Sequence, residues 1–353
     1  MKLKQYKIIN TLLGLIVFAI SLWQYASTAE SAGSLWDCGE FISCAYKLQI
    51  AHPPGAPLFL MMGRVFSLFA SDPSHVAFMI NLLSAVMSAG AVMFLFWIIT
   101  IIAKRIVARN EEDLTTDRVI SIMGSGLVGA LACSFSDSVW FSAVEGEVYA
   151  ASLFFISITF WAVMKWDEEA DEPHANRWLV FASFMIGLSI GVHLLSLLVI
   201  PAAALIYYFR KYEPNIKGFI IAFIVGFFVL GLVQVGVVST APLIASKFEY
   251  FAVNILRLPF NSGLIFAIIL FFGILVAIIR YANKIKHADM QLSAICALVI
   301  FIGFSSYAMV PIRATAFPPI NMNNPSDAYS LISYLNREQY GERPLLKGPM
   351  FDA

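Results

Sequence analysis

The sequence predicts an all-α, polytopic membrane protein, and three observations support this prediction. Of the 353 residues, 59% are hydrophobic and only 13% are charged, about half the charged share of an ordinary soluble domain. The mean hydropathy is +0.78. The apolar residues gather into stretches of about 20, the length that a helix needs to cross a bilayer. Soluble globules, disordered chains and coiled coils are therefore excluded, and 23 basic against 23 acidic residues argue against a nucleic-acid-binding surface.

Nine apolar stretches are predicted to be spans. The first follows a lysine-rich start and lacks a small-residue cleavage site, so it is predicted to be a retained helix rather than a signal peptide. Residues 178–209 are too long for one crossing at about 1.5 Å per residue, which predicts two short helices meeting near His193, one of which could be re-entrant. The predicted spans are residues 8–26, 77–103, 119–136, 148–166, 178–192, 194–209, 218–240, 262–281 and 290–310.

The basic residues predict the orientation of these spans. With the N-terminus in the cytoplasm, fifteen of the 23 lysines and arginines fall on the inner side, as the positive-inside rule requires. Residues 1–310 are therefore predicted to form the membrane domain, and residues 311–353 to begin an outer-face segment that continues in the full-length protein. The predicted outer loops are residues 27–76, 137–147, the turn around 193, 241–261 and 311–353.

The first outer loop is far longer than a connection requires. It contains WDCGEF (36–41) and HPPGAP (52–57). The apolar stretch 58–69 that follows is interrupted by Gly63 and Arg64 and is too short to span, so it is predicted to be an interfacial helix.

Asp37 and Glu40 are the first candidates for catalysis. Three residues apart, they share one face of a helix, at a level where a partly desolvated carboxylate could act as a base. The same spacing is also typical of a helix cap, with Asp37 as the N-cap residue and Glu40 closing a capping box. Spacing alone favours the cap.

Three further residues are candidate substrate-binding groups. His52 sits in a proline-rich turn, where it could position a substrate, although a solvated or hydrogen-bonded turn histidine is the simpler interpretation. Glu147 lies at the start of a predicted span, where an ionisable group suggests function. Because Glu145 is two residues away, at most one of the two is expected to point inward, and Glu147 is favoured. His193 could be a satisfied core imidazole or line a cavity that opens outward.

Arg313 directly follows the last predicted span. It could snorkel to the headgroups, or its guanidinium could bind the phosphate of a lipid-linked substrate.

No histidine pair has zinc-ligand spacing, so no metal site is predicted, although a divalent ion bound by carboxylates stays open. There is no Walker loop, dinucleotide fingerprint or G-x-S-x-G elbow, so an ATPase, a dehydrogenase or an ordinary serine hydrolase is unsupported.

The motifs taken together resemble a known family. Residues 36–59, NLLSA (81–85), EGEVYAA (145–151) and PIRA (311–314) are similar to the protein O-mannosyltransferase superfamily, and specifically to a bacterial branch long filed as a domain of unknown function. These are membrane glycosyltransferases of the GT-C fold. The resemblance runs along nearly the whole chain. Ala56 and Pro57 replace the Leu-Gly-Lys that usually follows the proline-rich turn, so the sugar is left open.

The resemblance implies a function. A polyprenyl-phosphate-linked, mannose-like sugar would pass to serine or threonine hydroxyls of exported proteins, at the periplasmic face of a bacterial inner membrane. Asp37 would be the general base, paired with Glu40. A leaving phosphate needs positive charge, and Arg313, backed by Arg64, is our candidate for that role. No cofactor is implied. An oligosaccharyltransferase, a transporter or flippase of lipid-linked saccharide, and a scaffold without chemistry stay open as alternatives.

Overall fold

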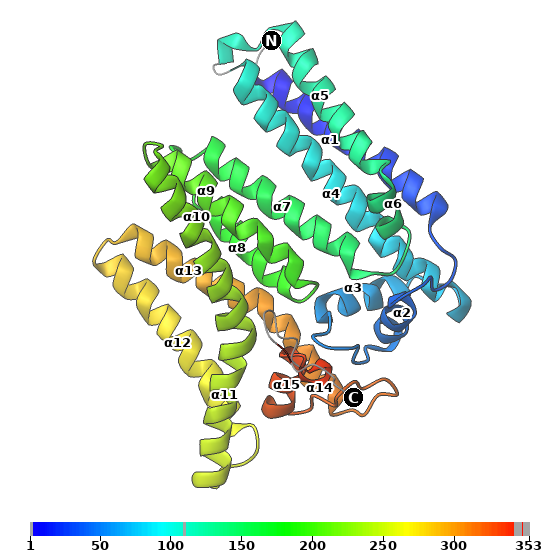
Figure 1. Cartoon of the computed structure of the whole chain (residues 1–353), viewed down its shortest axis with the longest axis vertical. Helices are drawn as coiled ribbons and strands as arrows, with labels where there is room; N and C mark the ends of the chain where they lie inside the picture. Colours follow the sequence, from blue (N-terminus) through cyan, green and yellow to red (C-terminus); the bar gives the residue numbers. More distant parts are fainter. Residues whose placement is uncertain (1–2, 109–110, 342–347, 349–353) are drawn as a thin grey trace.

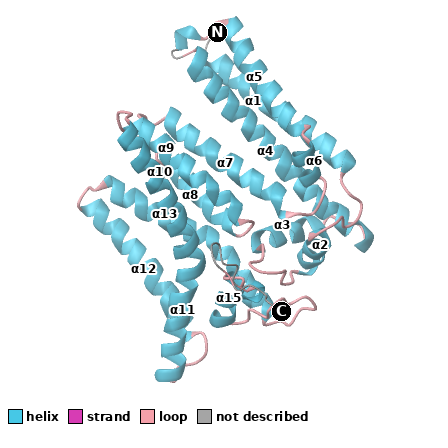
Figure 2. Ribbon diagram, in the orientation of Figure 1, coloured by secondary structure: helices cyan, strands magenta, loops and turns pink. Residues whose placement is uncertain are grey.

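The computed structural model describes residues 3–108, 111–341 and 348, and its regular elements are all helices (Figure 2). The all-α prediction is therefore confirmed. The α-helices are α1 (Leu3–Thr28), α2 (Cys38–Lys47), α3 (Pro57–Ser67), α4 (Val76–Val107), α5 (Thr116–Ser134), α6 (Asp137–Ala143), α7 (Val148–Glu168), α8 (Arg177–Ile190), α9 (Val199–Lys211), α10 (Ile216–Gly231), α11 (Ala241–Tyr250), α12 (Ser262–Lys284), α13 (Ala288–Phe304), α14 (Met309–Ala314) and α15 (Ala328–Leu335). Short 3-10 helices are η1 (Pro73–His75), η2 (Glu111–Asp113), η3 (Leu194–Leu198), η6 (Ser305–Ala308) and η7 (Glu338–Tyr340), and π-helical segments are η4 (Leu232–Thr240) and η5 (Phe251–Ile255).

Seven helices in the described residues are long and apolar enough to cross a membrane. An eighth is reached if α5 and α6, bent by 65° at their junction, count as one span. The remaining predicted span, residues 178–192, corresponds to α8, which at 14 residues is shorter than a bilayer normally requires. The protein is thus a multi-pass membrane protein, and the predicted break at 193 is confirmed because α8 ends at Ile190 and η3 begins at Leu194.

One predicted outer loop is instead helical. Residues 241–261 were predicted to be an outer loop, but α10, η4, α11 and η5 run on as one helical segment, Ile216–Ile255. Its 40 residues would measure about 60 Å, roughly twice the hydrocarbon thickness of a bilayer. The sequence did not reveal this continuation, because residues 218–240 already have the length of a span and more polar residues follow them.

The helices pack as a series of neighbours across the molecule (Figure 1). α1 and α5 flank α4, which packs on α7; α7 packs on α8, α8 on α13, and α13 on α12. The contact of α8 with α13 is especially close, because a Cβ on Gly187 would lie 2.3 Å from the carbonyl oxygen of Ile300 and one on Gly303 would lie 2.4 Å from the amide nitrogen of Leu188. Small residues at such crossings are what allow helices to approach closely in lipid.

The first outer loop and the C-terminal part of the described chain lie together at the end of the bundle away from the N-terminus (Figure 1). Here α2 and α3 pack against each other, and α14 packs against α15. Ile50 forms an isolated parallel β-bridge with Asn321. The predicted outer-face segment 311–353 is described as far as residue 341 and at Gly348, and the rest of it lies outside the described residues.

Candidate active site

Asp37, Glu40 and His52 come together beside the first turn of α2. The two oxygens of the Glu40 carboxylate accept hydrogen bonds from the backbone N–H of His52 (2.7 Å) and from its ring Nδ1 (2.9 Å). The other ring nitrogen, Nε2, lies 3.9 Å from Oδ2 of Asp37. The Asp37 side chain is 57% exposed, so its carboxylate faces outward while Glu40 anchors the turn behind it.

The structure rules out the capping box. Asp37 does occupy the N-cap position of α2, but its backbone is helical (φ −84°, ψ −3°) and its side chain makes no capping hydrogen bond. Glu40 bonds His52 rather than the N-cap backbone. The cap interpretation was wrong because the partner of Glu40 is twelve residues away and spacing within the helix could not reveal it. The hydrogen-bonded turn histidine is confirmed.

The turn that carries His52 is supported from the far end of the chain. The backbone N–H of Gly55 closes the turn on the carbonyl of His52 (2.8 Å), and Gly55 has φ +72°, where glycine is the favoured residue. The buried hydroxyl of Tyr334 donates to the carbonyl of Ala51 (2.6 Å), and that of Tyr307 to the carbonyl of Gly55 (3.5 Å). Residues far apart in sequence therefore hold His52 in place.

Charge on the Glu40–His52 pair follows from these contacts. Burial by itself would raise the pKa of Glu40, but the hydrogen bonds from the His52 ring and backbone, with the imidazolium charge, lower it overall. The hydrogen bond to Glu40 raises the pKa of His52 against the opposing effect of burial, and the charges of Glu40, Asp37 and Glu147 raise it further. Both shifts favour the charged forms, an imidazolium beside a carboxylate, and the Nε2 edge of this imidazole faces Asp37.

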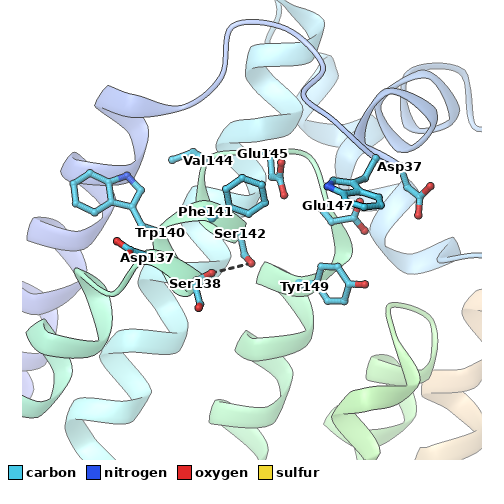
Figure 3. Close-up of a pocket in the computed structure, with 11 residues that line it drawn as sticks. Asp37, Asp137, Ser138, Trp140, Phe141, Ser142, Val144, Glu145, Glu147 and Tyr149 are labelled. Carbon is cyan, nitrogen blue, oxygen red and sulfur yellow. Dashed lines mark hydrogen bonds between the residues drawn. The ribbon is translucent and has the colours of Figure 1, made fainter.

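A pocket of about 950 Å³ opens in front of Asp37, and the second outer loop supplies its other wall (Figure 3). Its residues are Trp36, Asp37, Asp137, Ser138, Trp140, Phe141, Ser142, Val144, Glu145, Glu147 and Tyr149. Aromatic faces and carboxylates in one pocket suit a sugar, whose C–H faces stack on rings and whose hydroxyls donate to oxygens.

Glu145 and Glu147 both line this pocket and both are buried, at 4% and 5% exposure. The prediction that at most one of them points inward was wrong, because residues 144–147 are not helical and the helical-face argument does not apply. Glu145 accepts a hydrogen bond from the Ser34 hydroxyl. Glu147 accepts from the backbone N–H of Val148 (3.2 Å) and lies 3.9 Å from the Cys38 sulfur.

Burial of the Glu147 carboxyl raises its pKa from 4.5 to about 7; the Val148 N–H and His52 oppose this shift, and the charges of Asp37 and Glu145 add to it. Folding therefore favours the protonated form, so the stability that this group contributes is lost as pH rises through 7. We expect the melting temperature of the full-length protein to fall between pH 6 and pH 8, by the equivalent of about 1 kcal/mol of unfolding free energy, and the fall to be smaller in Glu147→Gln.

Thermal unfolding in detergent across this pH range measures the effect. Glu338→Gln, which removes an exposed carboxylate, is the matched control and should keep the wild-type fall. An equal fall in Glu147→Gln and in wild type would assign the pH dependence to another group.

His193 lies beyond the aromatic edge of this pocket. Its ring centroid is 5.4 Å from that of Tyr149, and its Nδ1 accepts the backbone N–H of Leu195 (3.2 Å). Burial lowers the pKa of His193, and the positive charge of Arg337 lowers it further. Arg337 is therefore a cation near this edge that the sequence did not single out, since it sits among the charges of the C-terminal segment without a motif.

Arg64 and Arg313 lie elsewhere. Arg64 donates to the carbonyl of Tyr46 (2.6 Å), and Arg313 donates to those of Leu48 (2.7 Å) and Lys47 (3.2 Å). These carbonyls end α2, whereas Asp37 begins it, and a ten-residue helix is about 15 Å long. The structure thus brings Asp37, Glu40, His52 and Glu147 together, sets His193 next to them behind Tyr149, and leaves both arginines at the far end of α2.

Within the described residues, Asp37, Glu40 and His52 are also the group whose arrangement could hold a divalent cation, with one ligand atom of each within 4.8 Å of the others. Both carboxylate oxygens of Glu40 already accept hydrogen bonds from His52, one from its backbone N–H and one from its ring Nδ1. These hydrogen bonds are sufficient to explain why the two side chains lie together.

The family model described as the protein O-mannosyl-transferase TMEM260 N-terminal domain matches residues 37–216, half of the chain. The chain belongs to this family. The TMEM260 N-terminal match begins at Asp37 and includes Glu40, His52, Glu147 and His193, whereas Arg313 lies beyond it.

Relatives with the TMEM260 name are similar over part of their length. The protein O-mannosyl-transferase tmem260 of Dictyostelium discoideum is 28% identical over 191 residues, which cover 51% of this chain and 21% of that protein. The TMEM260 of Mus musculus is 26% identical over 155 residues, covering 44% of this chain and 19% of that protein. The match thus spans about a fifth of these relatives. No solved structure matches the chain.

Proposed function

We propose that the full-length protein is a membrane glycosyltransferase that moves a mannose-like sugar from a polyprenyl-phosphate donor to serine or threonine hydroxyls of exported proteins. Membership of the TMEM260 N-terminal family supports the reaction class. The observation that carries the proposal is the exposed carboxylate of Asp37, held at the edge of a pocket that is lined by aromatic rings and two buried glutamates. The proposed setting is the periplasmic side of a bacterial inner membrane.

In the proposed reaction, the acceptor hydroxyl oxygen attacks the anomeric carbon and its proton passes to the Asp37 carboxylate. The bond between that carbon and the phosphate oxygen breaks, and polyprenyl phosphate leaves with the electron pair. A single displacement inverts the anomeric centre. His52, 3.9 Å from Asp37 with a raised pKa, supplies positive charge close to the reacting groups, and Glu40 positions it.

The donor's phosphate must lie near Asp37 when transfer occurs, because it is bonded directly to the anomeric carbon. Arg64 and Arg313 are about 15 Å away along α2, so they do not contact the phosphate during this step in the arrangement described. Arg337 is the proposed candidate for this contact, because its charge acts on His193, whose ring lies against Tyr149 of the pocket.

The test is sugar transfer by the full-length protein in reconstituted vesicles. Labelled polyprenyl-phosphate mannose and a mixture of exported proteins are supplied in one arm, and a lipid-linked oligosaccharide replaces the donor in a second. Label on protein in the first arm alone is the expected result. Label only in the second arm would indicate an oligosaccharyltransferase. Movement of the donor from one leaflet of the vesicle membrane to the other, without labelled protein, would indicate a flippase.

A further inference from the structure

A second pocket, of about 310 Å³, lies at the C-terminal end of α2 and is lined by Tyr46, Lys47, Leu48, Arg64 and Arg313. Three separate segments each contribute one positive charge to it: the end of α2, α3 and α14. None of these three basic residues forms an ion pair with a carboxylate in the described part of the chain. A concave site with unpaired positive charge is suited to an anion.

Both guanidinium groups are fixed but not fully used. Arg64 donates from Nη1 to the Tyr46 carbonyl and the Ser67 hydroxyl, and Arg313 donates from Nε and Nη2 to the carbonyls at the end of α2. A guanidinium has five N–H donors. Some of these donors have no hydrogen-bond partner among the described residues: Nε and Nη2 of Arg64, and Nη1 of Arg313. Both guanidinium groups are therefore held in place and still have N–H groups that can donate to phosphate oxygens.

Apolar side chains close in sequence to Arg64 and Arg313 are exposed. Val65, the residue after Arg64 on α3, is 54% exposed, and Leu68 and Phe69, which follow α3, are 65% and 71% exposed. Ile312, which precedes Arg313, is 67% exposed. Exposed apolar surface beside unpaired cations at the end of a membrane bundle is typical of the headgroup level, where a lipid presents phosphate and acyl chains together.

We propose that this pocket binds the headgroup phosphate of an anionic glycerophospholipid, at a site separate from the one around Asp37. A bound phosphate would join the end of α2 to α3 and α14. Because Asp37 and Glu40 stand at the other end of the same short helix, the lipid would fix the helix that carries them. The site exists whether or not the chain transfers sugar.

Lipid binding to purified, delipidated full-length protein tests this. Native mass spectrometry with phosphatidylglycerol, phosphatidylcholine and polyprenyl phosphate as separate probes measures the affinities. We expect phosphatidylglycerol to bind and Lys47→Gln to weaken it about fivefold, the factor expected for one basic residue lost near an anionic headgroup. Lys47 is the chosen position because its side chain makes no hydrogen bond among the described residues, unlike those of Arg64 and Arg313.

Arg257→Gln, which removes an exposed arginine from the loop before α12, is the matched control and should bind as wild type does. Equal phosphatidylglycerol affinity in Lys47→Gln and wild type would overturn the proposal. So would tight, Lys47-dependent binding of polyprenyl phosphate without phosphatidylglycerol binding, which would make this a donor site. Neither result depends on glycosyl transfer, so failure here is distinct from failure of the proposed function.

Discussion

Asp37→Asn should reduce sugar transfer by roughly 10²–10⁴-fold, the contribution typical of a general base. The amide has the same shape as the carboxylate but cannot take the acceptor's proton. Folding should be unchanged, because the Asp37 side chain is 57% exposed and makes no capping hydrogen bond. The loss would therefore report chemistry rather than assembly.

Initial rates of label transfer by the full-length protein in vesicles, with melting temperature as the folding readout, measure this effect. Asp289→Asn removes an exposed carboxylate from the first turn of α13 and is the matched control. A variant at Asp37 that keeps a third or more of the wild-type rate would exclude it as the base and direct attention to the carboxylates on the other wall of the pocket.

The second large effect is expected at Glu40, whose two oxygens hold both the backbone and the ring of His52. Glu40→Gln keeps one acceptor and turns an NH₂ group toward the second donor, so one half-buried N–H loses its partner. We expect a stability loss of about 1–3 kcal/mol and, because the turn beside Asp37 moves, a fall in transfer of about 10²-fold.

Comparison with His52→Gln and with the double variant separates positioning from a direct role. If Glu40 acts only through His52, the double variant should transfer as slowly as the worse single variant, since the two residues act as one unit. Additive losses would show that Glu40 acts on the reaction independently. Chemical denaturation of each variant measures its free energy of unfolding and so tests the expected loss of stability.

Much of the fold could be predicted because the length of each apolar stretch indicates whether it can cross the membrane as a helix. Runs of about 20 apolar residues located the seven helices in the described residues that are long and apolar enough to span, and the excess length of 178–209 located the break at His193. The helical continuation to Ile255 was not predicted, since residues 218–240 already have the length of a span and the residues that follow include Pro242, Lys247 and Glu249. Local composition identifies a helix well and its end poorly.

The site was predictable only where its parts are close in sequence. Asp37 and Glu40 are neighbours on α2, but the contact of Glu40 with His52 depends on a turn that reverses the chain. Glu145 joined Glu147 in the pocket because the loop before α7 is irregular. Arg313 looked like a phosphate ligand by its place after a span, whereas its position at the far end of α2 depends on how α14 packs.

The support under the His52 turn has a consequence for biosynthesis. Ala51 accepts its hydrogen bond from Tyr334, and Ile50 pairs with Asn321, so the loop made early in translation is braced by residues made some 280 positions later. While the ribosome is still adding the intervening helices, Asp37 and His52 have no such brace. The contacts that hold the His52 turn can therefore form only after Asn321 and Tyr334 have been synthesised, so the turn beside Asp37 is expected to reach its final arrangement late in the folding of the chain.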